Sequence, residues 1–154
     1  MLRTRTLIMS PLLLACAFSG SGIAQSMPPH LEEGTNVPAF HAKPPASAEK
    51  LSPILRPDQL SSDSQRHPFV ARAYLIAARI HRTLYQLPCY CHCDQTVGHT
   101  SLRSCYADDH ASHCAACLQE LFYADQMLKQ GKTAKEIRAG IEHGDFQQVD
   151  LNKV

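Results

Sequence analysis

Apolar residues recur at three- and four-residue spacing between Phe69 and Leu87, which is the period of an amphipathic helix. Pro68 suits the first turn of such a helix. Pro88 should end it, because the residue before a proline is pushed out of the helical region. The apolar face comprises Val70, Tyr74, Ile76, Ala77, Ile80 and Leu84. The pattern therefore predicts a helix that leads directly into the segment after Pro88.

A second helix is predicted further along the chain. Either Asp108 or Asp109 could cap its first turn, and an acidic residue there favours the positive end of the helix dipole. The helix should run to Gln130, with Gly131 as its terminator. Its apolar packing surface comprises Leu118, Leu121, Phe122 and Met127.

A third, short helix should follow. Thr133 and Glu136 have the spacing of a capping box, and Ile137 and Ile141 supply an apolar face. Residues 146–154 are expected to be a polar, frayed tail.

The first 24 residues have the three-part pattern of a secretory signal. Arg3 and Arg5 form a short positive region, residues 7–18 are an apolar run, and residues 22–24 are a small-residue cleavage site. The apolar run is too short to span a membrane. Residues 13–16 (Leu-Leu-Ala-Cys) also have the form of a bacterial lipobox, in which case the signal would be residues 1–15 and Cys16 would carry a lipid. Both alternatives predict export to the periplasm or cell envelope, and only the second attaches the chain to a membrane.

Residues 25–62 should form a linker without a core of their own. Seven of the chain's ten prolines lie here, with few large apolar residues. Such a segment buries too little apolar surface to offset the entropy of ordering it, and its prolines keep it extended. The predicted fold class is therefore all-α. A disordered Pro-rich tether precedes a small helical domain of residues 63–145, whose first two helices form a hairpin across a Cys-rich loop.

The charge balance gives no reason to expect a nucleic-acid partner. The formal charge is +1, and removal of residues 1–24 takes away two arginines and no acid, which changes it to −1. A near-neutral chain has little electrostatic attraction for nucleic acid or for an anionic membrane surface.

Six of the seven cysteines fall between Pro88 and Cys117, together with four histidines. Residues 89–93 place three cysteines at alternate positions, in the order Cys-Tyr-Cys-His-Cys. On the second predicted helix, the residues at i, i+3, i+4 and i+7 share one face. These are His110, His113, Cys114 and Cys117. Thiols and imidazoles at this density indicate metal binding, thiol redox chemistry or disulfides.

Metal binding is the first expectation. Imidazoles and thiolates bind Zn²⁺ in tetrahedral sets of four, and an excess of thiolates favours Cu(I). The expected ligands are Cys89, Cys91, Cys93, Cys114 and Cys117, with Cys105, His110 and His113 as a second tier. Because these exceed one tetrahedral site, either two ions or spare, exchangeable ligands should follow. Spare ligands are what a metal carrier needs.

Two alternatives stay open. Cys114 and Cys117 form a Cys-x-x-Cys pair, where the helix dipole and neighbouring histidines could lower a thiol pKa and favour thiol–disulfide exchange. In an exported protein, six cysteines could instead form three disulfides, each stabilising a small domain by about 2–4 kcal/mol. Disulfides leave the clustering of histidines unexplained, and cysteines one residue apart do not easily bond to each other.

The order of these motifs resembles a known family. Residues 88–93 (Pro-Cys-Tyr-Cys-His-Cys), 98–106 (Gly-His-x-Ser-Leu-x-x-Cys-Tyr), 113–117 (His-Cys-x-x-Cys) and 131–141 (Gly-Lys-Thr-x-x-Glu-Ile-Arg-x-x-Ile) are similar to bacterial exported proteins and lipoproteins named for a Pro-Cys-Tyr-Cys-Gly-Cys motif. The likeness covers residues 67–145, and His92 stands where the motif has glycine. The resemblance implies a cell-envelope protein without an established biochemical role, and selenocysteine in some relatives would favour redox chemistry. Residues 114–141 also resemble, more loosely, the small helical thiol reductant of cytochrome c maturation.

These patterns together predict an exported protein that captures a metal ion, Cu(I) before Zn²⁺. It would hand the ion to another metal-handling or thiol protein of the envelope by thiolate exchange, without turning over a substrate. A thiol–disulfide oxidoreductase is the alternative, and a disulfide-stapled interaction domain is the second alternative.

Overall fold

The computed structural model describes residues 36–64 and 67–154, and within those ranges it contains helices and irregular segments but no strand. The α-helices are α1 (Pro68–Leu84), α2 (Cys93–Thr96), α3 (Ala115–Lys129) and α4 (Ala134–His143). Short 3-10 helices occupy Pro57–Gln59, Ser104–Tyr106, His110–His113 and Asp145–Gln148. The predicted all-α class is confirmed. The expected signal sequence, with Cys16, lies outside the described residues.

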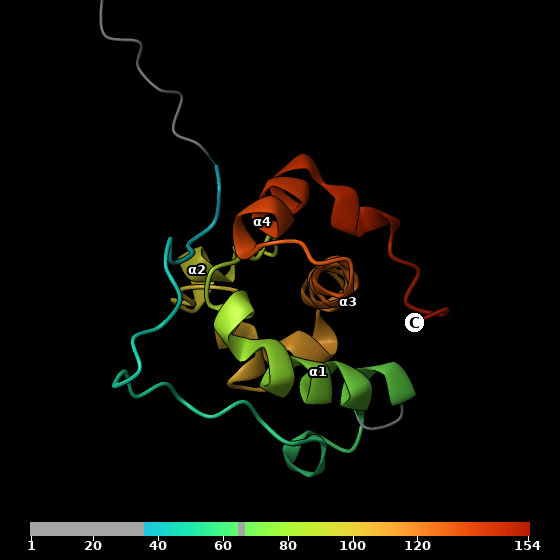
Figure 1. Ribbon diagram of the computed structural model, residues 1–154. Coiled ribbons are helices and arrows are strands. Elements are labelled where there is room, and N and C mark those ends of the chain that lie inside the picture. Colours follow the sequence, from blue (N-terminus) through green and yellow to red (C-terminus); the bar gives the residue numbers. More distant parts are fainter. Residues whose placement is uncertain (1–35, 65–66) are drawn as a thin grey trace, which may run out of the picture. The chain divides into compact units, whose positions relative to one another are not determined.

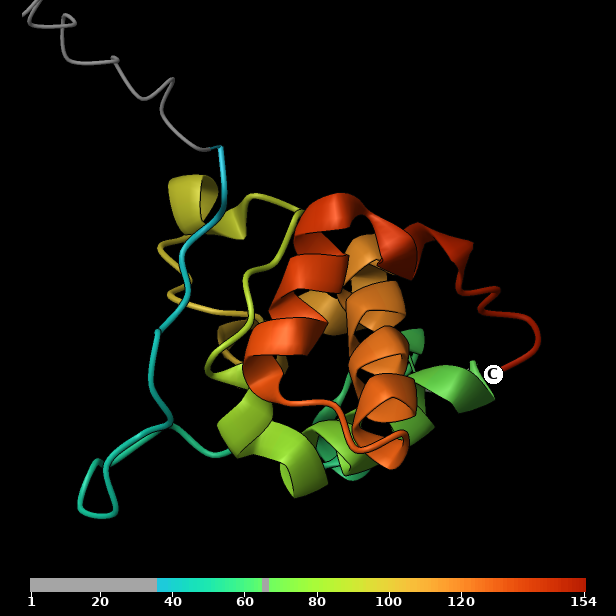
Figure 2. The ribbon, with the colours of Figure 1, turned by 45° about the horizontal axis from the view of Figure 1, so that its top comes forward.

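Helix α3 is the centre of the fold. It lies between α1 and α4, and Figure 1 shows it almost end-on. Most of its side chains are buried, including Leu118, Leu121 and Phe122, and so are Ile137 and Ile141 of α4. In the turned view of Figure 2, α4 covers one side of α3 while α1 passes beneath it. None of the helices in the described part of the chain has the length and apolar character needed to cross a membrane.

Helix α1 ends earlier than Pro88. It begins at Pro68, as expected, but its last residue is Leu84, and Tyr85 caps it. Buried Leu87 then lies in a turn, and its carbonyl accepts a hydrogen bond from the amide of Leu102 at 2.8 Å. The chain therefore returns to the end of α1 at Leu102, so residues 88–101 form a closed loop. This loop carries Cys89, Cys91 and Cys93.

The second predicted helix is broken. Residues 110–113 form a separate 3-10 turn, and Cys114 has an extended backbone (φ −121°, ψ 108°) before α3 begins at Ala115. The prediction of one continuous helix from Asp108 or Asp109 is therefore wrong. Its C-terminal end is confirmed, because Gly131 adopts φ 79° and its amide donates to the carbonyl of Leu128.

Helix α4 has the predicted start, but the tail after it is not frayed. The Thr133 hydroxyl accepts from the Glu136 amide, which completes the capping box. Beyond the helix, Phe146 and Val149 are 4% and 8% exposed. The Nε2 group of Gln119 donates to the Val149 carbonyl at 3.0 Å. The prediction of a loose tail at 146–154 is corrected, since these contacts hold its first residues against α3.

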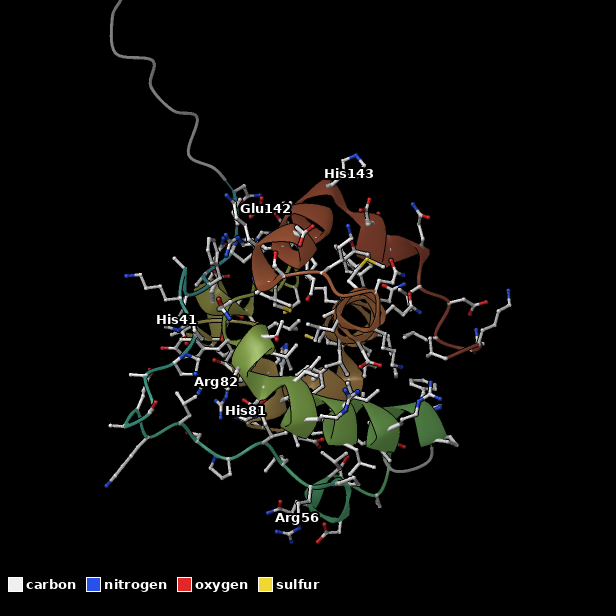
Figure 3. All side chains as sticks on the ribbon, viewed as in Figure 1. His41, Arg56, His81, Arg82, Glu142 and His143 are labelled. Atoms are coloured by element: carbon white, nitrogen blue, oxygen red, sulfur yellow. The ribbon has the colours of Figure 1, made fainter. Side chains whose placement is uncertain are left out.

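Part of the expected linker packs on the helical domain. The ring of His41 stacks on Tyr85 with 3.7 Å between centroids, and the Leu55 amide donates to the Tyr106 carbonyl at 3.0 Å. Arg82 of α1 donates to the Pro45 carbonyl at 3.1 Å, and Figure 3 shows His41 and Arg82 on this side of the molecule. The boundary expected at residue 63 is therefore too late for the described residues. Residues 25–35 lie outside the described part.

Candidate metal centre

Four segments bring sulfur atoms together next to the C-terminal end of α1. The turn after α1 carries Cys89 and Cys91, and Cys93 opens α2. The 3-10 helix at residues 104–106 carries Cys105, and Cys117 lies in the first turn of α3. Except for the half-buried Cys91, these residues are at most 3% exposed. The predicted convergence of the loop cysteines on the start of the second long helix is therefore observed.

The sulfur atoms are in contact. The Sγ atom of Cys89 lies 3.3 Å from that of Cys91 and 3.3 Å from that of Cys117. The sulfurs of Cys93 and Cys105 are also 3.3 Å apart. A disulfide would require about 2.05 Å, and all six described cysteines are free thiols.

Two groups of four donor atoms are close enough to surround an ion. In each group, every donor lies within 4.8 Å of the others. The first group comprises Cys89, Cys91, Cys93 and Cys105, and the second comprises Cys91, Cys105, His110 and Cys117. A Zn–S bond of about 2.3 Å places tetrahedral sulfurs about 3.8 Å apart. The observed contacts are only slightly shorter, so a small outward movement would admit a metal.

Two predicted ligands lie outside both groups. His113 is exposed, and its Nε2 atom contacts the Ser64 hydroxyl at 3.2 Å and Asp109 at 3.4 Å. Cys114 is half-buried and takes no part in either donor group. The break before α3 explains this result, because it removes the common helical face that was expected to align these residues with Cys117.

His99 is a donor that the expected ligand set omits. Its Nδ1 atom lies 3.2 Å from the sulfur of Cys93 and 3.3 Å from that of Cys105, while Nε2 lies 3.0 Å from Oδ2 of Asp108. A proton on Nε2 satisfies the carboxylate and leaves the lone pair of Nδ1 directed at the sulfurs. A carboxylate behind a histidine is the usual support of a metal-binding imidazole. In the sequence, the position of His99 between Cys93 and Cys105 is the feature that points to this role.

Asp108 also orients the second imidazole. Its Oδ1 atom accepts the backbone amide of His110 at 2.9 Å, and Nε2 of His110 lies 3.6 Å from the Cys91 sulfur. The hydroxyl of Tyr74 donates to the Asp108 carbonyl at 2.8 Å, which fixes this residue to α1. One aspartate thus holds both histidines that face the sulfurs.

The thiols differ in their readiness to ionise. Hydrogen bonds from neighbouring thiols, first from Cys105, lower the pKa of Cys91 far below its ordinary value and lower that of Cys93 to about 4. The same network raises the pKa values of buried Cys89 and Cys117, again with Cys105 as the largest contributor. Within the cluster, ionisation is therefore favoured at Cys91 and Cys93 over Cys89 and Cys117, and a thiolate is the form that binds a metal ion.

Glu120 is a buried acid that the sequence analysis did not single out. It is 0% exposed on α3, and its Oε1 atom accepts the Tyr90 amide at 2.7 Å. Its other oxygen has no hydrogen-bond partner, and burial raises its pKa to about 8. The carboxyl group therefore holds the backbone between Cys89 and Cys91. No periodic signal distinguishes it from a solvated acid on a helix.

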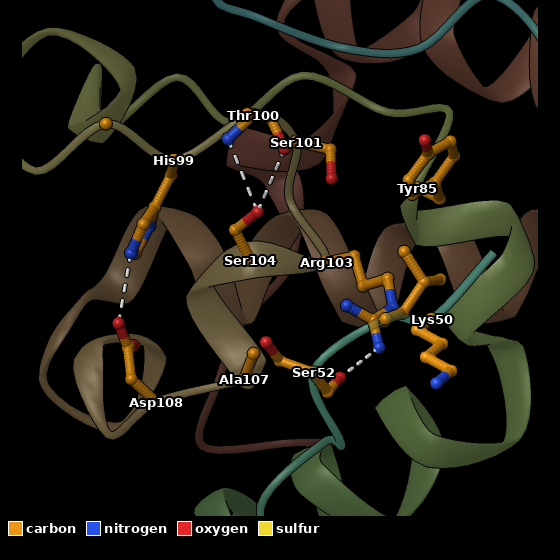
Figure 4. A pocket seen from close by; sticks show the side chains of 12 residues that line it. Lys50, Ser52, Tyr85, His99, Thr100, Ser101, Arg103, Ser104, Ala107 and Asp108 are labelled. Atoms are coloured by element: carbon orange, nitrogen blue, oxygen red, sulfur yellow. Dashed lines mark hydrogen bonds and ion pairs between the residues drawn. The ribbon is translucent and has the colours of Figure 1, made fainter. Parts of the chain in front are cut away.

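A polar cavity of about 410 Å³ lies on the outer side of His99. Lys50, Tyr85 and Arg103 contribute to its wall, and Figure 4 shows the His99–Asp108 contact on the opposite wall. Nδ1 of His99 contacts the sulfurs on its inner side. The imidazole thus separates this cavity from the sulfur atoms.

Comparison with known proteins identifies the family of the chain. Residues 49–148 match the family described as "Protein of unknown function with PCYCGC motif". The chain belongs to this family. His92, at the position of the motif's glycine, adopts φ 55° and is the one non-glycine residue with positive φ among those described. The backbone there is left-handed, a conformation that glycine adopts without strain. No curated protein and no solved structure matches the chain.

Proposed function

We propose that this chain captures a soft metal ion, Cu(I) in preference to Zn²⁺, and passes it on by thiolate exchange. The observation that carries the proposal is the convergence of five buried or half-buried sulfurs and two imidazoles without a disulfide among them. Cysteine packs well as a small apolar residue, but packing alone does not bring so many ligand types to one point.

The donor set favours a soft ion. The first donor group consists of four sulfurs, and thiolates bind Cu(I) more strongly than they bind harder cations. Zn²⁺ also accepts four thiolates and is the competing ion. Excess donors beside a complete group allow a ligand to be replaced without loss of the ion, which suits transfer more than permanent structural binding.

Cys91 is the expected point of transfer. It is half-buried, whereas Cys89, Cys93, Cys105 and Cys117 are buried. A partner's thiol could reach the ion on this side first and replace one ligand at a time. In this proposal the partner is another metal-handling or thiol protein of the cell envelope. The chain would be exported by a signal of residues 1–24, or by one of residues 1–15 with a lipid then attached to Cys16.

A metal titration tests the proposal. The reduced protein should bind Cu(I), and more weakly Zn²⁺, with a dissociation constant below about 1 μM in competition with a chelator. Cys105→Ser should weaken binding strongly because this sulfur belongs to both donor groups. Cys114→Ser is the matched control and should bind as the parent does. If neither ion binds below about 1 μM, metal capture is rejected.

Thiol–disulfide exchange is the second candidate, and one observation favours it. Cys114 is half-buried at the start of α3, and its hydrogen bond with Cys117 lowers the Cys114 pKa to about 6. A thiolate with this pKa is a competent nucleophile near neutral pH. If the chain is a thiol–disulfide oxidoreductase, Cys117→Ser should trap a mixed disulfide between Cys114 and a partner protein. Absence of that adduct, with an ordinary thiol pKa at Cys114, would remove this candidate.

A further inference from the structure

The two donor groups described above are not separate sites. They have Cys91 and Cys105 in common, so together they contain six different donors. Two four-coordinate ions with no common ligand would need eight donors. If each ion takes the four donors of its group, Cys91 and Cys105 bind both ions, and thiolate sulfur is a soft donor that suits Cu(I).

We propose that the sulfur cluster holds two Cu(I) ions at once, bridged by the thiolates of Cys91 and Cys105. This inference rests on the proposed function and specifies what the site carries. Cys89 and Cys93 complete the shell of the first ion. His110 and Cys117 complete the shell of the second.

The second ion adds no net charge to the site. Four thiolates around one Cu(I) carry a net charge of −3. The second shell adds one cation, one further thiolate at Cys117 and the neutral imidazole of His110, so the net charge stays at −3. Buried charge is costly, and the second ion adds none. Each thiol that binds releases its proton to solvent, and the copper stays Cu(I) throughout.

The backbone already holds both shells in register. Asp108 accepts the amide of His110 through Oδ1 and contacts Nε2 of His99 through Oδ2. The two imidazole rings meet edge to face, with 5.2 Å between centroids. His110 thus faces the second shell, and His99 stands beside Cys93 and Cys105 of the first. One aspartate therefore holds an imidazole donor of the second shell and an imidazole beside the first.

Copper stoichiometry tests this inference in the whole reduced chain, with Cys16→Ala in every variant so that this remote thiol cannot bind copper. Cys114, a thiol outside both donor groups, also remains and is tested by its own variant. Native mass spectrometry in the presence of a competing Cu(I) chelator should show two ions per chain. X-ray absorption should show a copper–copper vector. His110→Ala and Cys117→Ser should each reduce the count to one, and His113→Ala and Cys114→Ser should leave it at two. His110 is only partly buried, so its variant remains informative if the Cys117 variant does not fold.

The outcomes separate this inference from the function on which it rests. One ion per parent chain overturns the two-ion site and leaves metal capture intact. No bound ion overturns both. The bridged arrangement is overturned if two ions bind without a copper–copper vector. It is also overturned if His110→Ala and Cys117→Ser both retain two ions.

Discussion

The interior of this domain has two parts that are chemically different. Between α1, α3 and α4 it is hydrocarbon, with side chains such as Leu84, Leu121 and Ile141 at 0% exposure. Next to the end of α1 it is sulfur and imidazole, held by short turns and by the first turn of α3. Hydrocarbon needs no partner beyond close packing. Contacting thiols also pack, but they remain ligands. Burial alone therefore does not distinguish a core from a site; the chemistry of the buried atoms does.

The largest effect should come from the hydrocarbon part. Leu121→Ala removes a fully buried side chain of α3 and should destabilise the protein by about 2–5 kcal/mol in urea unfolding. The loss should be similar with and without metal, because Leu121 belongs to neither donor group. Leu75→Ala, at a position 61% exposed, is the control and should change little. A loss seen only in metal-loaded protein would show that the two parts are not independent.

Metal should stabilise the sulfur part by mass action. A ligand that binds only the folded state adds about 2.7 kcal/mol when its free concentration is 100 times its dissociation constant. We therefore expect Cu(I) to raise the urea midpoint and a chelator to return it to the metal-free value. The increase should be lost in Cys105→Ser and kept in Cys114→Ser. An unchanged midpoint in the parent protein would mean that the sulfur cluster is only a core.

The helices of the hydrocarbon part could largely be predicted from the sequence, because the features that define them involve residues close together in the chain. Periodic apolar residues located α1, the capping box of Thr133 and Glu136 located α4, and Gly131 located the end of α3. These features depend on neighbours a few residues away. Phe146 and His41 contact residues that are far away in the sequence, so no local pattern in the tail or the linker predicted these contacts.

For the sulfur part, the composition of the sequence predicted that a site exists, but the residue spacing did not predict its geometry. The density of cysteines predicted a common site, but the spacing of His110, His113, Cys114 and Cys117 also predicted a helical face that does not exist. The side chain of Ser112 donates to both the carbonyl and the carboxylate of Asp109, at 2.7 and 2.6 Å. Such bonds compete with helix continuation. A heptad-like spacing therefore says little where short polar residues can bond to their own backbone.

A smaller effect should come from the ion pairs that join α1 to α3. Asp125 is 4% exposed and binds Arg79 of α1 and Lys129 of its own helix. Burial alone would raise the pKa of Asp125, but hydrogen bonds from Lys129 and Arg79 outweigh it and hold the pKa below its ordinary value. Asp125→Asn should cost about 1–2 kcal/mol near neutral pH.

This contribution should depend on pH in a defined direction. Because the folded-state pKa of Asp125 is depressed, its stabilisation is present above the unfolded value of 3.8 and is lost as the pH falls through the folded value. The difference in unfolding free energy between the parent and Asp125→Asn should therefore shrink in acid. Asp58→Asn, at an exposed pair with Arg56, is the control. A difference that stays constant down to low pH would assign the effect to packing.

The smallest effect on stability should come from substitution of His92, which lies between Cys91 and Cys93 of the sulfur part. Its left-handed backbone costs a side-chain-bearing residue about 1–2 kcal/mol, whereas glycine loses about 0.5–1 kcal/mol through chain entropy. His92→Gly should therefore change the free energy of unfolding by no more than about 1 kcal/mol, and His92→Ala should be no more stable than His92→Gly. Neither should alter copper stoichiometry, because the imidazole belongs to neither donor group. A copper ion lost in both variants would make His92 a ligand. Retention in both would show that position 92 serves the site through its backbone, which turns Cys91 and Cys93 toward the other sulfurs.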